Sequence, residues 1–340
     1  MSQSESVNKE LFELFKTMER ENSDQPRALS ETITTINQLM LENNDAALAA
    51  TVSALKDSGH KLRAGNLIDQ VCEMREVGVT FEKDGQKQES KGLARLFAIP
   101  VVMLRQDAMI GLNQIGGQKL ASGFYDHGLV EGDAMVYLNS GLYTYESLNL
   151  APSQRAAIVE KMIGGESMGL PLATPVSQNE LALRFIIGVV VTKPESEDIF
   201  SQPEGSKFAE KVQAWGRDWL ATLQPQFGAF QLAQPSRFSL GLNEGMILLR
   251  ENALRMISEQ AVNRYGEQIT TLMETIVSPK GTMVAIRFGE KQKSVTHQTF
   301  WPLVNGEALP AAIKTIKERL STYGISQIKH VETAQAVNFH

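Results

Sequence analysis

The chain has 340 residues, a formal net charge of −6 and a single cysteine, Cys72. Its length exceeds what one hydrophobic core usually organises, so we expect two domains or one domain with a helical appendage. The acidic balance argues against a general affinity for the phosphate backbone of nucleic acids. The lone cysteine excludes an internal disulfide framework and zinc sites built from several thiolates.

The first residues, MSQSESVNKE, are polar and lack the apolar core of a secretory signal peptide. No apolar window of the sequence reaches the length of a membrane span. The share of hydrophobic residues, 42%, is ordinary for a globular chain. We therefore expect a cytoplasmic protein with no direct membrane insertion.

Residues 7–75 have a helical pattern, in which apolar side chains recur three and four positions apart. Asn43-Asn44-Asp45 interrupts this pattern and can cap an alanine-rich helix that follows. Short connections between helices favour antiparallel neighbours, so residues 1–81 are predicted to form a helical region. Residues 82–93 are charged and contain glycine, which makes them the candidate linker.

The next part, residues 94–224, is organised around FIIGVVV at positions 185–191. This run is uncharged, mostly β-branched and does not alternate with polar residues, which predicts a strand covered on both faces. Further predicted elements are a strand at 95–104, a helix at 110–129, strand and loop at 134–148, a helix from Pro152 to Met162 closed by Gly164-Gly165, and a helix capped by Ser206. Together they predict a first α+β unit.

Residues 225–340 have the clearest order of elements. A short strand at 230–232 precedes a long helix, two strands, a helix ending at Gly324 and a last strand at 328–337. The order β-α-β-β-α-β is that of a ferredoxin-like unit. The predicted fold is α+β: an N-terminal helical region followed by two α/β sandwich units, the last of them ferredoxin-like.

Several strings in this order resemble an uncharacterised bacterial family known only as a domain of unknown function. They are NDAALAA, ARLFAIPVVML, RFIIGVVV, WGRDWLATLQPQFGAFQLAQP and TFWPLVNGE, followed by an amphipathic helix and YGI. The resemblance covers most of the chain after Asn43 and is one of segment order, without a catalytic motif. It implies a common fold at most, and it brings no activity or site residues.

The sequence offers few candidates for chemistry. The phosphate-binding loop pattern G-x-x-x-x-G-K-[ST] is absent, and no two histidines stand at the spacing of a helical zinc site. We therefore predict no catalytic residue, no metal ligand and no cofactor. Cys72 lies on an apolar helix stripe, which indicates a buried and inert thiol.

Five residues are the candidate ligand-binding side chains, and a pocket between the two α+β units could gather them. They are His127, Arg184, His297, Tyr143 and Tyr145. Two of them have simpler explanations: His127 suits a helix C-terminus before Gly128, and His297 suits a half-buried strand face.

Trp215 and Trp219 share one face of a predicted helix. Tryptophans at this spacing usually belong to the hydrophobic core. If the helix lay at an exposed edge, the two side chains would instead anchor a protein interface.

These observations favour a non-enzymatic protein-binding or assembly component, an adaptor or scaffold in a cytosolic bacterial complex. Its expected partner is another protein or a second copy of the chain, and no nucleic acid. The alternative is a small-ligand-binding protein or enzyme with its pocket between the two α+β units.

Overall fold

The structure is a computed structural model, and it describes residues 7–21, 28–83, 86–103, 119–130, 134–139, 141–173, 181–194, 196, 199–201, 207–227, 230–278, 281–290, 297–304 and 306–332. The chain forms two compact units. The first consists of Met1–Gln178 and Arg184–Leu242, and the second of Asn179–Leu183 and Asn243–His340. Both contain helices and strands, which confirms the α+β class.

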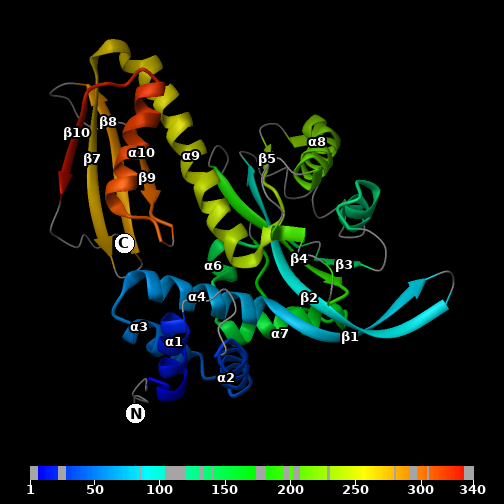
Figure 1. Ribbon diagram of the computed structural model, residues 1–340. Coiled ribbons are helices and arrows are strands. Elements are labelled where there is room, and N and C mark those ends of the chain that lie inside the picture. Colours follow the sequence, from blue (N-terminus) through cyan, green and yellow to red (C-terminus); the bar gives the residue numbers. More distant parts are fainter. Residues whose placement is uncertain are drawn as a thin grey trace. The chain divides into compact units, whose positions relative to one another are not determined.

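Four helices at the beginning of the chain pack into a bundle within the first unit (Figure 1). They are α1 (Lys9–Glu21), α2 (Leu29–Leu41), α3 (Asp45–Ala54) and α4 (Ser58–Glu73). Their apolar stripes meet in one core, to which α1 contributes Leu11 and Phe15. The helix α3 begins after the predicted break, because the Asn44 side chain accepts a hydrogen bond from the Ala47 amide at 3.3 Å.

The first sheet has β1, β2, β4 and β3 adjacent in that order, with β5 and β6 also paired to β2. The strands are β1 (Met74–Lys83), β2 (Gln86–Met103), β3 (Met135–Leu138), β4 (Ala182–Thr192), β5 (Phe230–Leu232) and β6 (Ser236–Arg237). All residues of β4 are buried, so the strand predicted at 185–191 is confirmed as covered on both faces. A Cβ atom at Gly188 would lie 2.3 Å from the Phe97 ring, so this close packing requires glycine.

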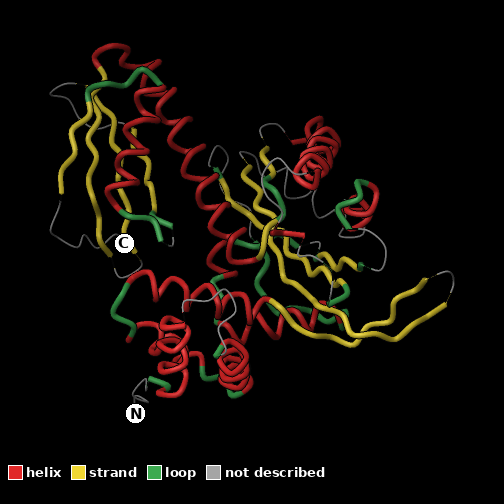
Figure 2. The backbone as a smooth tube through the Cα atoms, in the orientation of Figure 1, coloured by secondary structure: helices red, strands yellow, loops and turns green. Residues whose placement is uncertain are grey.

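Further helices of the first unit surround this sheet (Figure 2). They are the helical residues 119–126, α6 (Tyr145–Leu148), α7 (Pro152–Ile163), the short 3-10 helix η1 (Ile199–Ser201) and α8 (Lys207–Phe227). The helix α7 packs against α2 and α4 of the bundle and against β1, β2 and β3 of the sheet. Its predicted ends are confirmed: Pro152 is its first residue, and Gly165 follows it with a φ of 70°.

The second unit contains a four-stranded sheet in the order β10-β7-β8-β9. Its elements are the long helix α9 (Phe238–Tyr265), which begins in the first unit, the 3-10 helix η2 (Gly266–Gln268), β7 (Ile269–Ser278), β8 (Gly281–Glu290), β9 (His297–Pro302), α10 (Leu309–Thr322) and β10 (Ile328–Glu332). One face of the sheet buries Met273, Ile286 and Trp301 in a core with Ile316 of α10. The strands β7, β8 and β9 are antiparallel, and β10 is parallel to β7.

Two parts of the sequence prediction differ from this arrangement. The strand 230–232, predicted to open a ferredoxin-like unit, is β5 and pairs with β2 in the first sheet, Val101 opposite Leu232. Of the predicted linker 82–93, residues 82–83 belong to β1 and residues 86–93 to β2, where Glu82 pairs with Lys87 and Glu76 with Leu93. Charge and glycine fit an exposed ribbon as well as a linker, and a short apolar run does not specify its partner strand.

Some predicted features lie outside the described residues, among them positions 110–118 of the predicted helix 110–129 and the cap at Ser206. Within the described residues, no helix combines the length and the apolar character that crossing a membrane would need.

Candidate functional site

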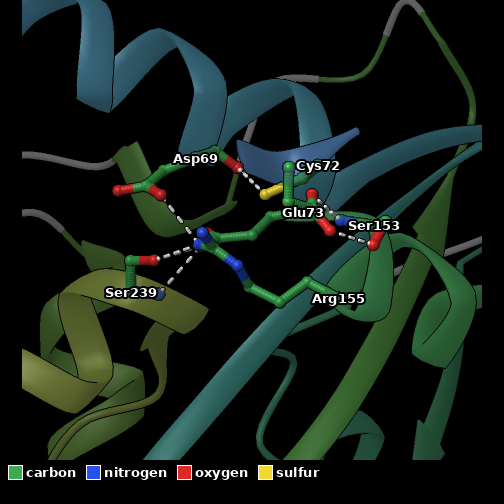
Figure 3. Close-up of polar contacts among 7 residues, drawn as sticks. Asp69, Cys72, Glu73, Ser153, Arg155 and Ser239 are labelled. Carbon is green, nitrogen blue, oxygen red and sulfur yellow. Dashed lines mark hydrogen bonds and ion pairs between the residues drawn. The ribbon is translucent and has the colours of Figure 1, made fainter. Parts of the chain in front are cut away.

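A buried polar cluster in the first unit joins α4, α7 and the beginning of α9 (Figure 3). It contains Asp69 and Glu73 from the last turns of α4, Arg155 from α7 and Ser239 from the first turn of α9. Arg155 is 8% exposed and Glu73 is 4% exposed, so two ionisable groups lie in the interior. Charged groups are rarely buried unless they are paired, so their partners decide what the cluster can do.

One nitrogen of Arg155 carries most of the contacts in this cluster. Arg155 Nη1 donates to Asp69 Oδ1 at 2.8 Å, to Glu73 Oε1 at 3.0 Å and to Ser239 Oγ at 2.7 Å. These three acceptors share the two hydrogens of that nitrogen. The guanidinium charge is thus placed between two carboxylates.

The carboxylate of Glu73 caps the beginning of α9. Its Oε1 atom accepts a hydrogen bond from the Ser239 amide at 3.1 Å, and the Ser239 hydroxyl donates to the same oxygen. A carboxylate is stabilising there because the first amides of a helix lack partners within the helix. Glu73 therefore replaces a local cap residue with one that is distant in the sequence.

Asp45 of α3 likewise caps the beginning of α7 with a carboxylate that is distant in the sequence. Asp45 Oδ1 accepts a hydrogen bond from the Ser153 amide at 2.9 Å, and the Ser153 hydroxyl donates to Asp45 Oδ2. The first turns of α7 and α9 are thus both capped by carboxylates from the helical bundle. The polar contacts hold the bundle to the rest of the first unit.

The burial of Glu73 has an electrostatic consequence. Desolvation raises the pKa of Glu73 to about 7, although the hydrogen bonds from Ser239 and the charge of Arg155 oppose this rise. Burial also raises the pKa of the Cys72 thiol far above its ordinary value. Cys72 is 0% exposed and donates to the Asp69 carbonyl oxygen at 3.2 Å, which agrees with the buried, inert thiol that was expected.

The residue types in this cluster raise two kinds of chemistry, metal binding and proton transfer. Within the described residues, Asp69, Cys72 and Glu73 are the one group whose acidic and thiol atoms all lie within 4.8 Å of one another, which suggests a metal site. However, Arg155 already supplies the cation between the two carboxylates, and the thiol favours its protonated form. Glu73 could act as a base near neutral pH, but its oxygen is engaged by three donors. The geometry is that of a structural connection.

The five candidate ligand-binding residues occupy three places. Tyr143, Tyr145 and Arg184 lie around the beginning of β4, where Tyr143 forms a bridge with Phe185 and the Tyr145 ring centroid lies 6.5 Å from that of Phe185. His127 follows the helical residues 119–126, and its Nε2 atom lies 3.1 Å from Asp218 Oδ2 of α8.

His297 belongs to the second unit, where its ring packs edge-on against Tyr265. The structure therefore brings the two tyrosines and Arg184 near one another and leaves His127 at a separate place in the first unit. A ligand-binding role for these residues stays a prediction.

Trp215 and Trp219 are buried in the first unit, at 1% and 8% exposure. Trp215 packs against Phe124 with 5.3 Å between ring centroids, and Gly123 leaves room for its indole. They belong to the core, which was the first of the two alternatives. Their burial leaves little surface for the role of interface anchors.

A second candidate site is a groove of about 320 Å3 in the first unit. We call it the β3 groove, because residues 136–139 line it and no residue of the neighbouring strand β4 does. Its lining comes from residues 119–126, from β3 and from the end of α7: Ala121, Val136, Tyr137, Leu138, Asn139, Met162, Gly165 and Glu166. The groove combines apolar side chains with open backbone groups of an edge strand.

Sequence reasoning missed both sites. Glu73 and Arg155 are 82 positions apart, and Glu73 and Ser239 are 166 apart, so no local spacing connects them. One signal was present: Arg155 lies on the stripe of α7 that also carries Val159 and Met162, where a charge demands a buried partner.

Comparison of the chain with known proteins found no match. No protein-family model matches the chain, no curated protein matches it, and no solved structure resembles it.

Proposed function

We propose that the chain is a protein-binding component of a larger cytoplasmic assembly, as an adaptor or scaffold. The observation that carries this proposal is a two-stranded arm that projects from the first sheet (Figure 1). We define the β1–β2 arm as residues 78–83 and 86–91, which pair from Gly78 and Lys91 outward to Lys83 and Gln86.

The arm extends beyond the strand that supports it. Gly92 lies beside Val191 and Thr192, at the very end of β4. Among the described strands, residues 86–91 therefore run past β4 and pair with β1. An isolated two-stranded ribbon is marginally stable in water, and its outer edges expose backbone N–H and C=O groups that can pair with another chain.

The side chains on the arm agree with a surface that is kept soluble until a partner binds. Thr80, Glu89 and Lys91 are exposed. Lys91 Nζ lies 3.4 Å from Glu76 Oε2 in an ion pair with both side chains in solvent, which contributes little stability. Charges on an edge discourage unspecific pairing and leave the choice of partner to complementary charges.

The proposal is tested by site-specific photo-crosslinking in the native cell. A photoreactive amino acid replaces Thr80 in one variant and Glu89 in another, and a control variant carries it at Glu31, an exposed position on α2. We expect both arm positions to give an adduct of one defined mass that the Glu31 variant does not give. Mixing two differently tagged copies shows whether the adduct is a second copy of this chain.

A variant with a shortened β1–β2 arm provides the second test. An Asn-Gly turn replaces residues 79–90, because Gly78 and Lys91 are paired and a two-residue turn can join them. The shortened protein should fold and should lose its partner in native mass spectrometry. The proposal is wrong if it retains the same partner at the same stoichiometry, or if the arm positions give no adduct.

A further inference from the structure

We propose that the β3 groove binds an extended peptide segment of a partner protein by strand addition, with a basic side chain of the peptide beside Glu166. This inference rests on the proposed protein-binding function and assigns a second contact site, separate from the β1–β2 arm. It is carried by the free edge of β3, the shape of the groove and the charge at one end of it.

The pairing of β3 with β4 fixes which backbone groups face the groove. The Asn139 amide donates to the Ile187 carbonyl oxygen of β4 at 3.0 Å, so the odd-numbered residues of β3 direct their N–H and C=O groups toward β4. In an antiparallel pair these directions alternate. The backbone groups of Val136 and Leu138 therefore point away from β4 and into the groove.

Tyr125 already occupies one end of this edge. Its hydroxyl donates to the Ala134 carbonyl oxygen at 3.1 Å and accepts from the Val136 amide at 3.0 Å. These are the bonds that a neighbouring strand would otherwise make. Within the described residues, no other strand pairs with the Val136 carbonyl or with the two backbone groups of Leu138, so an added strand would begin at Tyr125 and continue toward Asn139.

The walls of the groove suit an extended chain. Ala121 and Gly165 have small or no side chains, Met162 and Val136 are apolar, and the volume of about 320 Å3 is near the lower end of ligand sites, about 300–1,000 Å3. In strand addition the backbone gives affinity and alternate side chains give specificity. The groove therefore accepts a short segment whose small or β-branched side chains lie on its floor.

The negative charge of Glu166 at one end of the β3 groove favours a basic residue in the bound peptide. Glu166 lines the groove, is exposed, and lies three residues after the end of α7. The C-terminus of a helix carries a partial negative charge, which adds to that of the carboxylate. A lysine or arginine of the peptide would be favoured there, and an acidic residue would be repelled.

The test uses a phage-displayed library of random octapeptides, panned against the full chain. We expect enrichment of peptides that alternate β-branched residues and contain one lysine or arginine. The enriched peptide is then synthesised with a fluorescent label, and its affinity is measured by fluorescence anisotropy. N-methylation of the amide that pairs with Leu138 should weaken binding about fivefold to tenfold, through the loss of one backbone hydrogen bond.

Two protein variants with matched controls locate the binding site. Ala121→Trp fills the groove and should weaken binding at least about tenfold, whereas Ser122→Trp, at the exposed neighbouring position, should not. Glu166→Lys should weaken binding about twofold to fivefold, as expected for an exposed ion pair. Its control, Glu31→Lys, makes the same change of net charge on α2 and should have no effect.

The outcomes separate this inference from the proposed function. Absence of enriched peptides, or equal binding by the wild-type and Ala121→Trp proteins, overturns the peptide site and leaves the crosslinking result on the β1–β2 arm standing. Binding that survives in the shortened-arm protein and is lost in Ala121→Trp supports the groove whatever the arm does.

Discussion

The polar cluster around Arg155 and the β3 groove belong to the same unit but differ in their polar groups. Those of the cluster are bonded within the fold, whereas those of the groove lie at a strand edge. In the cluster, the buried carboxylate of Glu73 and the buried guanidinium of Arg155 bind each other, the Ser239 side chain and the partly exposed carboxylate of Asp69. In the groove, the Val136 carbonyl and both backbone groups of Leu138 have no partner strand among the described residues. A buried polar group must be satisfied within the fold, so an ionisable cluster is weak evidence of a reaction centre, whereas an open strand edge is available to a partner.

The largest effect should come from removing the cation of the cluster. Arg155→Met leaves the buried Glu73 and the adjacent Asp69 without their counter-charge. Breaking a buried ion pair from one side costs about 3–5 kcal/mol of unfolding free energy. Urea denaturation at pH 8 measures this loss.

The control for this variant is Lys91→Met, which breaks the exposed pair with Glu76. Its unfolding free energy should change by less than about 1 kcal/mol. Similar losses in the two variants would contradict the difference between the buried cluster and the surface.

The next effect concerns pH. Because the pKa of Glu73 is raised from 4.5 to about 7, the folded state holds a proton that the unfolded state releases between these values. This contribution to stability is present below about pH 4.5 and is lost as the pH rises to about 7, by about 3 kcal/mol in total. Glu73→Gln cannot titrate, so its unfolding free energy should vary less over this range.

Denaturation curves of both proteins at pH 5, 6, 7 and 8 provide the measurement. If the two proteins show the same pH dependence, Glu73 is not the group that titrates. Asp45→Asn is a matched control, because this more exposed carboxylate also caps a helix and its amide variant retains an acceptor oxygen.

A third prediction tests the close packing between β4 and β3 at Gly188. Gly188 lies opposite Leu138, and a Cβ atom there would lie 2.8 Å from its side chain and 2.3 Å from the Phe97 ring. Gly188→Ala should lower the unfolding free energy by about 1–3 kcal/mol through overpacking. Gly78→Ala, where a Cβ meets nothing within 4 Å, is the control in thermal denaturation.

The smallest effect should come from Tyr125→Phe, which removes the hydroxyl that pairs with the edge of β3. The loss of stability should be about 0.5–1.5 kcal/mol, the usual contribution of a hydrogen bond. Hydrogen exchange at the Val136 amide should become faster. Unchanged exchange would mean that the hydroxyl does not protect this edge.

The sequence predicts most of the local structure, because local structure follows from nearby residues. The uninterrupted run 185–191 indicates a doubly covered strand, and Pro152 with Gly164-Gly165 marks the ends of α7. The pairing of β5 with β2 could not be predicted, since a three-residue apolar run carries no register information.

The candidate sites were harder to predict than the elements. The cluster joins residues from three distant segments, and the β3 groove depends on backbone groups whose direction the side-chain pattern does not reveal. An arginine on the apolar stripe of α7 was the available clue, but this position does not reveal the partners of the charge.

The distant origin of the residues around Arg155 also bears on how fast the protein unfolds. A connection between positions 73, 155 and 239 closes long loops, which is costly early in folding, so we expect it to form after the main folding barrier. Arg155→Met should then accelerate unfolding and leave the folding rate nearly unchanged in stopped-flow experiments. The cluster would thus set the lifetime of the folded chain in addition to its equilibrium stability.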